Sequence, residues 1–356
     1  MSPRVERREL PVLVHGATGY TGKLVARELI RRAIPFGISG RSARKLADLA
    51  AALNIPIPQI VIPEGDATLL AETLHNVRVV INCAGPYMQL GAPVVKAAIA
   101  SGSHYLDVTG EQEFVRAMHE HDRAAVLAGA CIVPSMAFEV CLSDCAARLA
   151  AQRVAQVDDL DVTYRVDRAK ASGGTLRTIF RMMQEAETLT GWHEVQFPDD
   201  PRTYGGFEIP GAELATIPRH TQAKRVHVYM STGGPMQGWL TRQLLPHAKM
   251  MIDSFPYQWL KGRVEATPTG TGPADAERKE HRWRLAVQAS GPSGKARVDL
   301  AGPDPYGLTA VIAVLGARLM LESGFAKKGV LAPSQAFDAS SVLEALKDDG
   351  VSLRLE

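Results

Sequence analysis

Short apolar runs alternate with helical patterns over the first 150 residues. The apolar runs predict strands, and the segments between them place apolar residues three and four positions apart, as a helix does. The expected strands are Pro11–His15, Phe36–Ser39, Ile60–Ile62, Val79–Cys83, Tyr105–Val108 and Cys131–Pro134. The expected helices are Gly19–Ala33, one capped by Ser42 and ending at Leu53, Ala67–Leu74, Ala92–Ala100 and Glu111–Leu127. Such alternation predicts an α/β fold with a doubly wound parallel sheet, covered by helices on both faces.

The pattern changes after residue 150, where longer segments alternate apolar and polar residues. Alternation of this kind is typical of a half-buried antiparallel sheet. The expected strands are Val157–Asp167, Ala223–Ser231, Arg282–Ser290 and Lys295–Ala301, and the expected loops are Phe197–Gly211 and Thr267–Asp275. We therefore expect a second α+β domain with a mostly antiparallel sheet over residues 151–302. Residues 303–356, with a helix at Thr309–Leu321, are expected to complete the first domain, residues 1–150.

A glycine-rich segment lies between the first expected strand and the first helix, with Gly16, Gly19 and Gly22 three residues apart. Gly16 allows a tight turn, Gly19 lets a pyrophosphate approach the backbone, and Gly22 lets the helix pack on the strand. The free N–H groups of the helix start favour phosphate, and Thr18, Tyr20 and Thr21 add hydroxyl donors. Strand, glycines and helix in this order predict a dinucleotide site of the Rossmann type.

The end of the second expected strand decides between NAD and NADP. NAD enzymes carry an acidic residue there, on the ribose hydroxyls. This chain has Gly40, Arg41 and Ser42 instead, followed by Arg44 and Lys45. A guanidinium and a hydroxyl suit a 2′-phosphate, and basic residues at a helix start otherwise oppose its dipole. The sequence therefore predicts NADPH as the cofactor.

Polar residues gather where the later strands end. Ala84, Gly85 and Pro86 are expected to form the wall beside the ribose and nicotinamide, because ligands bind at the carboxyl ends of parallel strands. Tyr87, Asp107 and Glu111 are the candidate proton donors for a reduction. Each has a structural alternative: Tyr87 as a wall, Asp107 as a partner of Thr109 and nearby backbone, and Glu111 as a helix cap. Glu139 follows the sixth strand and is a further candidate, while His104, Arg177 and ordered water are weaker ones.

Composition and residue spacing argue against several other classes of function. The net charge of +2 offers no reason to expect nucleic acid as a partner. No apolar run is long enough to span a membrane, and the first ten residues lack the apolar core of a signal peptide, so a cytoplasmic location is expected. The four cysteines form no CxxC pair, and His119 and His121 lie on different helix faces, so no metal site is expected.

Several of these motifs together resemble the saccharopine dehydrogenase-like reductases. They are the segment 16–22, Gly40-Arg41-Ser42, the segment 82–87 and the segment 104–111, extended by Ser172-Gly173-Gly174-Thr175 and by 303–306 and 329–333. The nearest resemblance is to the branch with trans-acting enoyl reductases, saccharopine dehydrogenase-like oxidoreductases and, close by, thiazoline reductases. It implies a Rossmann domain completed by the C-terminal residues, an inserted α/β domain whose sheet mediates a homodimer, and NADPH. The stretch Ala137–Asp144 departs from the family pattern, so the substrate pocket is expected to differ.

The leading hypothesis is an NADPH-dependent reductase of an activated C=C or C=N bond, in an enoyl thioester or a cyclic imine of specialised metabolism. The substrate is a small molecule or is bound to a carrier protein. The rival hypothesis is a non-catalytic NADP sensor or scaffold, which remains open because the sequence identifies no single proton donor.

Overall fold

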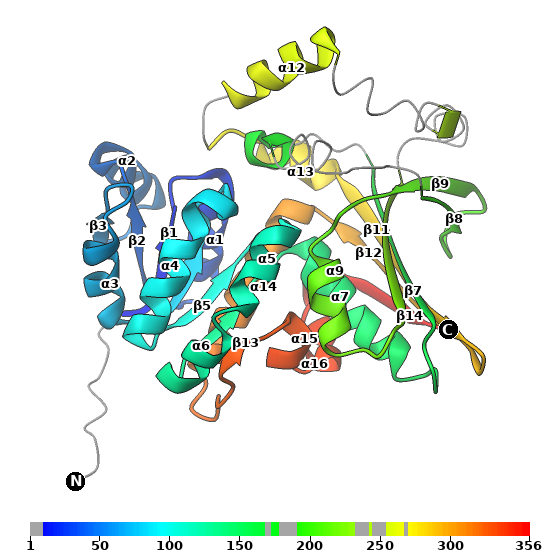
Figure 1. Cartoon of the computed structure of the whole chain (residues 1–356). Coiled ribbons are helices and arrows are strands. Elements are labelled where there is room, and N and C mark those ends of the chain that lie inside the picture. The colour runs from blue at the N-terminus through cyan, green and yellow to red at the C-terminus, as the bar shows by residue number, and fades with distance from the viewer. Residues whose placement is uncertain (1–9, 168–171, 178–190, 232–241, 244–253, 267–269) are drawn as a thin grey trace.

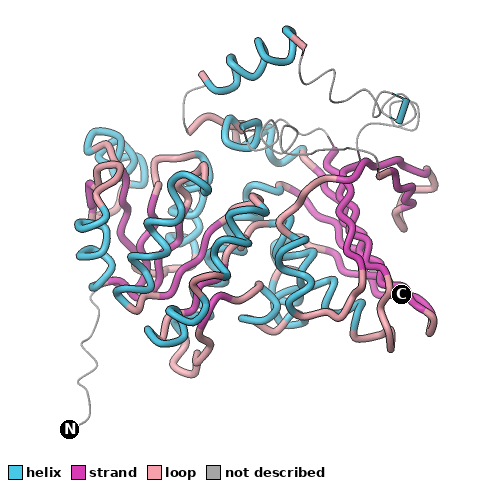
Figure 2. The backbone as a smooth tube through the Cα atoms, viewed as in Figure 1, coloured by secondary structure: helices cyan, strands magenta, loops and turns pink. Residues whose placement is uncertain are grey.

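The computed structural model describes residues 10–167, 172–177, 191–231, 242–243, 254–266 and 270–356. Two seven-stranded sheets organise these residues (Figure 1). The first sheet carries helices on both faces, and the second is a strongly twisted sheet on the opposite side of the molecule (Figure 2). The predicted fold class, a doubly wound parallel sheet joined to an α+β part, is confirmed.

The first sheet is parallel throughout, in the order β13-β6-β5-β4-β1-β2-β3. Its strands are β1 (Leu10–His15), β2 (Phe36–Gly40), β3 (Gln59–Val61), β4 (Val77–Asn82), β5 (His104–Asp107), β6 (Cys131–Val133) and β13 (Gly329–Val330). Strand order reverses between β1 and β4, since β2 and β3 extend to one side and the later strands to the other. An open sheet binds its ligand at such a reversal.

Alternate residues of these strands supply two separate cores. Val12, Val14, Val79 and Ile81 face one core, while Leu13 and Val80 face the other, as the two-residue period of a strand requires. Helices α1 (Tyr20–Arg31), α2 (Ala43–Leu53) and α14 (Pro305–Leu321) cover the first face. Helices α3 (Ala67–His75), α4 (Tyr87–Ser101), α5 (Gln112–His119) and α6 (Asp122–Ala128) cover the second.

The second sheet has the order β14-β12-β11-β7-β10-β9-β8, and every neighbouring pair is antiparallel except β7 with β10. Its strands are β7 (Asp159–Asp167), β8 (Trp192–Gln196), β9 (Thr203–Glu208), β10 (Arg225–Ser231), β11 (Arg282–Gly291), β12 (Gly294–Pro303) and β14 (Ser352–Leu355). The other elements are α9 (Glu213–Thr216), η1 (Ile217–Arg219), α12 (Phe255–Glu265), α13 (Asp275–Glu280), α15 (Pro333–Ala336), α16 (Ala339–Ala345) and η3 (Lys347–Asp349).

Helix α7 (Phe138–Ala151) joins the two sheets. It leaves β6 of the first sheet and packs against β7, β11 and β12 of the second, and against α14 to α16. Nearly all of its residues are buried, and its apolar side chains belong to the same core as those of β1, β4 and β11. One continuous hydrophobic core therefore extends under both sheets.

Several elements differ from the sequence-based expectation: β8 was not expected, α4 begins five residues before the expected helix at Ala92, and three further differences follow. The helix expected over Glu111–Leu127 is two helices, α5 and α6, separated at Glu120 and His121. The loop expected over Phe197–Gly211 contains β9, in which a Cβ on Gly205 would lie 1.9 Å from the Trp192 ring on β8. Gly205 therefore makes room for a cross-strand ring, and it had been taken as a turn signal. The third is β14, which pairs with β12 in the second sheet, although 303–356 as a whole was assigned to the first domain.

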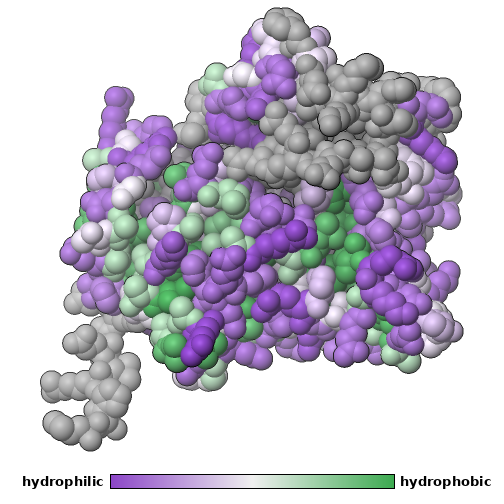
Figure 3. Space-filling view, viewed as in Figure 1, coloured by the Kyte–Doolittle hydropathy of each residue, from purple (hydrophilic) through white to green (hydrophobic). Residues whose placement is uncertain are grey.

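Polar side chains cover most of the face seen in Figure 3, with apolar ones gathered over the helices of the first sheet and beside the second sheet. Within the described residues, no helix is both long enough and apolar enough to span a bilayer.

Candidate functional site

The candidate site lies where four strands of the first sheet, β1, β2, β4 and β5, end side by side. His15 at the end of β1 is level with Ser39 on β2 and with Asn82 on β4, and Asn82 is level with Asp107 on β5. The residues that follow these positions, Gly16, Gly40, Cys83 and Val108, therefore share one edge of the sheet. Every segment with a predicted cofactor role begins at this edge.

The glycine-rich segment is held close to its neighbours by backbone contacts. The N–H groups of Gly16 and Ala17 donate to Ser39 O at 3.0 and 3.1 Å, and Gly16 has a φ of 73°. A Cβ at Gly16 would lie 2.7 Å from Ala84 N, and one at Gly22 would lie 2.5 Å from Gly16 O. Gly19 is the N-cap of α1 and has no side chain to cover the free N–H groups of the first turn. The turn expected at Gly16 and the helix packing expected at Gly22 are thus present, and the approach of a pyrophosphate to Gly19 stays a prediction.

Gly40, Arg41 and Ser42 lie at the end of β2. A Cβ on Gly40 would be 3.8 Å from the Thr18 hydroxyl, so this segment borders the glycine-rich one. Ser42 caps α2 by accepting from Lys45 N at 3.3 Å, as its sequence position predicts. Arg41 is 64% exposed and forms an ion pair with Glu64, which is 55% exposed and follows β3. The guanidinium therefore reaches the site edge, and a carboxylate competes with any anion that it binds.

Ala84, Gly85 and Pro86 lead from β4 into α4. Asn82 holds the turn, because its side-chain oxygen accepts from Ala84 N at 3.0 Å. Pro86 is the N-cap of α4, and Tyr87 begins the helix. The Tyr87 ring is buried against Phe114, and its hydroxyl donates to Asn82 O at 3.2 Å. Burial raises the pKa of Tyr87 well above its usual value, so its hydroxyl stays protonated.

Asp107 is fully buried at the end of β5 and holds backbone rather than facing an open space. One carboxylate oxygen accepts from Ser135 N at 2.8 Å and Thr109 N at 3.0 Å, and the other accepts from the Tyr105 hydroxyl at 2.8 Å. Burial raises the pKa of Asp107 to about 6, although these hydrogen bonds oppose the shift. Its bonds match the structural alternative stated from the sequence.

Glu111 caps a helix, but not the helix that it precedes. Its two carboxylate oxygens accept from Tyr87 N at 2.9 Å and from Met88 N at 3.1 Å, the first N–H groups of α4. The carboxylate therefore satisfies free donors and opposes the positive end of the α4 dipole. Residue 111 also forms a backbone bridge with Gly211, which precedes α9.

A segment of the chain from beyond α12 lies against the glycine-rich segment. The Tyr20 hydroxyl donates to Pro273 O at 2.6 Å, and a Cβ on Gly272 would overlap the Tyr20 ring at 2.4 Å. A Cβ on Gly270 would lie 2.9 Å from Thr18 O. Residues 270–273 therefore border the pyrophosphate position predicted for Gly16–Gly22. The Tyr20 hydroxyl, predicted to donate to the cofactor, donates to Pro273 O instead.

The remaining candidates take structural roles or lie elsewhere. The His104 ring accepts from Cys131 N at 3.0 Å. Arg177 donates to Glu265 O at an exposed position. Most of the apolar stretch Leu244–Leu260 lies outside the described residues. Across the described part of the chain, no cluster of His, Cys, Asp and Glu side chains is suited to hold a metal ion.

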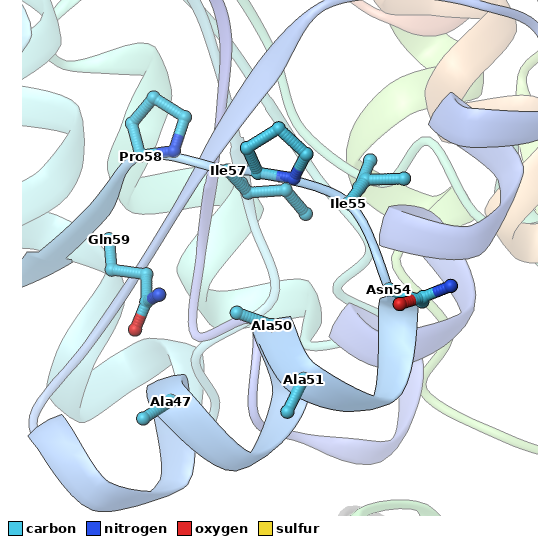
Figure 4. A pocket seen from close by; sticks show the side chains of 9 residues that line it. Ala47, Ala50, Ala51, Asn54, Ile55, Ile57, Pro58 and Gln59 are labelled. Atoms are coloured by element: carbon cyan, nitrogen blue, oxygen red, sulfur yellow. The ribbon is translucent and has the colours of Figure 1, made fainter.

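A surface hollow between α2 and β3 lies away from this edge (Figure 4). It is lined by Ala47, Ala50, Ala51 and residues 54–59. Gln59 begins β3, whereas Val61 at the other end of this strand is level with Gly40. The hollow therefore faces the amino ends of the strands, opposite the predicted cofactor edge.

Comparison with known proteins shows which family the first domain resembles. Residues 12–133 match the model of the saccharopine dehydrogenase NADP binding domain, which confirms the resemblance seen in the motifs. A saccharopine dehydrogenase-like oxidoreductase of Mus musculus is 32% identical over 153 residues, which cover 38% of this chain and 35% of that protein. A trans-acting enoyl reductase of Mycobacterium leprae (strain TN) is 30% identical over 188 residues, covering 49% and 44%. The match thus spans less than half the length of these relatives.

Among solved structures, apo saccharopine dehydrogenase (L-Glu forming) from Saccharomyces cerevisiae superposes with a TM-score of 0.62, covering 97% of this chain and 99% of that chain. At 14% sequence identity, this similarity shows a shared fold. The structural similarity therefore covers the second sheet as well as the first, but it concerns the architecture alone.

Proposed function

We propose that this chain, which carries a saccharopine dehydrogenase NADP-binding domain at residues 12–133, is an NADPH-dependent oxidoreductase that reduces an activated C=C or C=N bond. The observation that carries the proposal is the shared edge of β1, β2 and β4. The glycine-rich segment, Arg41 with Ser42, and Ala84–Pro86 all start there in register. These three segments correspond to the phosphates, the adenosine ribose and the nicotinamide of one extended dinucleotide.

The segment Gly16–Gly22 suits a pyrophosphate for two reasons. Its backbone is packed so closely that side chains at Gly16 and Gly22 would collide with backbone atoms, and Gly19 leaves the N–H groups at the start of α1 uncovered. Arg41 and Ser42 would hold the 2′-phosphate of NADPH, and Thr18, Thr21 and Gly40 would border it and the pyrophosphate. When bound, the cofactor supplies the hydride. Ala84, Gly85 and Pro86 would orient the ring that carries it.

The substrate class is an enoyl thioester or a cyclic imine. The name of the mycobacterial relative, trans-acting enoyl reductase, supports the first of these. A thioester tethered to a carrier protein is a natural form of such a substrate, and we include it in the proposal. We also propose that the protein is cytoplasmic and that the second sheet mediates a homodimer.

One observation favours the rival function, a non-catalytic NADP sensor or scaffold. Tyr87, Asp107 and Glu111 were the predicted proton donors, and each already serves the local structure through the bonds described above. We propose that these three side chains position the strand ends. If the protein is a reductase, the proton must then come from another group. If no such group exists, the protein binds NADPH without reducing a substrate.

The test mixes purified protein with NADPH and with either crotonyl-N-acetylcysteamine thioester or a 1-pyrroline. NADPH binding is followed by its fluorescence and turnover by the loss of its absorbance. Oxidation with one probe supports the reductase and selects the bond type. Tight NADPH binding without oxidation of either probe supports the sensor and contradicts the reductase as worded.

A further inference from the structure

A second group of ionisable side chains lies at the start of α7, which follows β6 at the same edge of the first sheet as the predicted nicotinamide position. Glu139 is in the first turn of this helix, which directly follows β6 and the segment Pro134–Ala137. This segment is adjacent to the end of β5, since Met136 N donates to Asp107 O at 2.7 Å and Ser135 N donates to the Asp107 side chain. Glu139 therefore lies at the same carboxyl edge as the glycine-rich segment, on the β4 side.

The backbone of Glu139 shares a hydrogen-bonding partner with a carboxyl from a distant part of the sequence. The Tyr164 hydroxyl on β7 lies 2.9 Å from the backbone carbonyl oxygen of Glu139 and also bonds to the carboxyl of Glu213 in α9. The Ser143 hydroxyl, one turn along α7, lies 3.3 Å from the same Glu213 oxygen. A Cβ on Gly211 would lie 2.2 Å from the other Glu213 oxygen, so glycine is needed where the chain turns into α9.

The proton count of this cluster is informative. Tyr164 has one hydroxyl hydrogen but faces two acceptors, Glu139 O and the Glu213 carboxyl. A proton on Glu213 resolves the conflict, because Glu213 then donates to Tyr164 and Tyr164 donates to Glu139 O. Glu213 is 2% exposed, and burial raises its pKa, which favours the protonated form.

Glu139 differs from the other carboxyls at this edge. Asp107 is fully buried and accepts three hydrogen bonds, and Glu111 accepts two from α4. Glu139 remains partly exposed at the start of its helix. No hydrogen bond joins its carboxyl to any other residue that the structure describes. Of these three groups, it is therefore the one whose carboxyl can exchange a proton without breaking a hydrogen bond that holds the fold.

We propose that Glu139 is the acid that protonates the substrate after hydride transfer, and that Tyr164 and Glu213 are positioning residues that hold the backbone of α7 at Glu139. This inference rests on the proposed reductase function and supplies the proton source that the function requires. A hydride from NADPH forms a new C–H bond, and the π pair of the C=C or C=N bond moves to the adjacent atom. That atom takes the Glu139 proton, leaving NADP⁺, a reduced substrate and a carboxylate that water reprotonates.

The electrostatic surroundings suit this role. Burial raises the pKa of Glu139 to about 7, close to the value at which an acid is most effective near neutral pH. The titratable groups around the cluster are Glu213, Tyr164, Asp144 and its partner His220. Asp144 and His220 are hydrogen-bonded to each other at 2.7 Å.

The decisive experiment compares Glu139→Gln with Glu139→Asp and with Glu72→Gln, a control at an exposed position on α3. Each variant receives NADPH and the thioester or imine probe that the native protein reduces. We expect Glu139→Gln to lower kcat by at least about 100-fold with an unchanged Kd for NADPH, Glu139→Asp to recover part of the loss, and Glu72→Gln to behave as the native protein.

The pH profile separates an acid from a structural residue. The native kcat should fall as pH rises through about 7, because Glu139 loses its proton. Glu213→Gln should leave this fall at the same pH, since Glu213 is already protonated and the amide keeps a neutral partner for Tyr164. Retention of more than about a third of kcat by Glu139→Gln, or a native profile that is flat through neutral pH, overturns the assignment to Glu139 while leaving the reductase intact. If the native protein reduces neither probe, the reductase itself fails, and the acid role falls with it.

Discussion

The two ends of the candidate site are built in opposite ways. At the glycine-rich end, consecutive residues shape the site by lacking side chains, and backbone lies within 3 Å of where a Cβ would be at Gly16 and Gly22. At the Glu139 end, groups from α7, β7 and α9 that lie up to 74 positions apart in the sequence meet through the Tyr164 hydroxyl. Adding a side chain should therefore weaken cofactor binding at the glycine-rich end. Removing a proton or a charge should instead impair catalysis or stability at the Glu139 end.

The largest expected effect is on the side-chain end, at the ion pair that anchors α7. Asp144 and His220 are 0% and 1% exposed and lie 2.7 Å apart, and Asp144 also accepts from Ser334 N at 2.8 Å. Asp144→Asn leaves a buried histidine without its charge partner and should reduce the free energy of unfolding by about 3 kcal/mol. Urea unfolding measures the change. Asp158→Asn, which breaks an exposed pair with Lys224, should cost less than about 1 kcal/mol.

This pair also predicts a dependence on pH. Although burial alone would raise the pKa of Asp144, His220 and the hydrogen bonds hold it below its ordinary value of 3.8. A lowered pKa in the folded state means that the stabilisation is present above pH 3.8 and is lost as pH falls below it. The native protein and Asp144→Asn should therefore approach each other in stability under acid. Parallel stability curves down to low pH would exclude this origin.

The next effect tests the glycine-rich end by adding a single carbon. Gly16→Ala places a Cβ 2.7 Å from Ala84 N at a φ of 73°. Gly129→Ala is a matched control, since Gly129 has a φ of 72° and nothing within 4 Å of its Cβ position. Both carry the backbone strain, but only Gly16→Ala should also weaken NADPH and NADH alike, by about 2 kcal/mol. Fluorescence titration measures both affinities, and equal binding by the two variants would mean that the turn tolerates a side chain.

A smaller and more selective effect is expected at Arg41. Arg41→Ala should weaken NADPH by about tenfold more than NADH, because a charge-assisted bond to the 2′-phosphate is lost. Glu64→Gln should tighten NADPH slightly, since the competing carboxylate no longer pairs with Arg41. Dissociation constants for both cofactors test this. An equal loss for NADPH and NADH in Arg41→Ala would refute the phosphate role.

The smallest effect concerns the segment that borders the glycine loop. Tyr20→Phe removes the 2.6 Å hydrogen bond to Pro273 O, which should cost about 1 kcal/mol and release both cofactors several-fold faster. Stopped-flow displacement of NADPH measures the rate. Tyr229→Phe on β10 makes the same substitution in the second sheet and should leave release unchanged. An unaltered rate in Tyr20→Phe would show that residues 270–273 do not restrain the cofactor.

The same contrast explains what the sequence could predict. The glycine segment, the Ser42 cap and the strand–helix order depend on residues within a few positions of one another, so the sequence pattern identifies them. The capping of α4 by Glu111 joins residues 24 positions apart, and the Tyr164–Glu213 contact joins residues 49 apart. Such partners meet only through the tertiary fold, and Glu213 was missed because nothing near it in the sequence marks it.

The strand predictions also succeeded where the signal is local and failed where it depends on tertiary contacts. The alternating strands of the second sheet were located within a few residues, but β9 was missed because Gly205 and Gly206 suggested a turn. In the structure, Gly205 leaves space for Trp192, a contact that no local pattern reveals. β14 was missed because its four residues derive their stability from pairing with β12.

The threading of the chain through both sheets has a consequence for biosynthesis. The first sheet is complete only when β13, at residues 329–330, joins β6, and the second only when β14, at residues 352–355, joins β12. As the polypeptide leaves the ribosome, the early strands must therefore wait with an unpaired edge until almost the whole sequence has emerged. We expect nascent chains stalled before residue 329 to be captured by chaperones and digested by protease at both sheets, and release of the finished chain to protect both within one step.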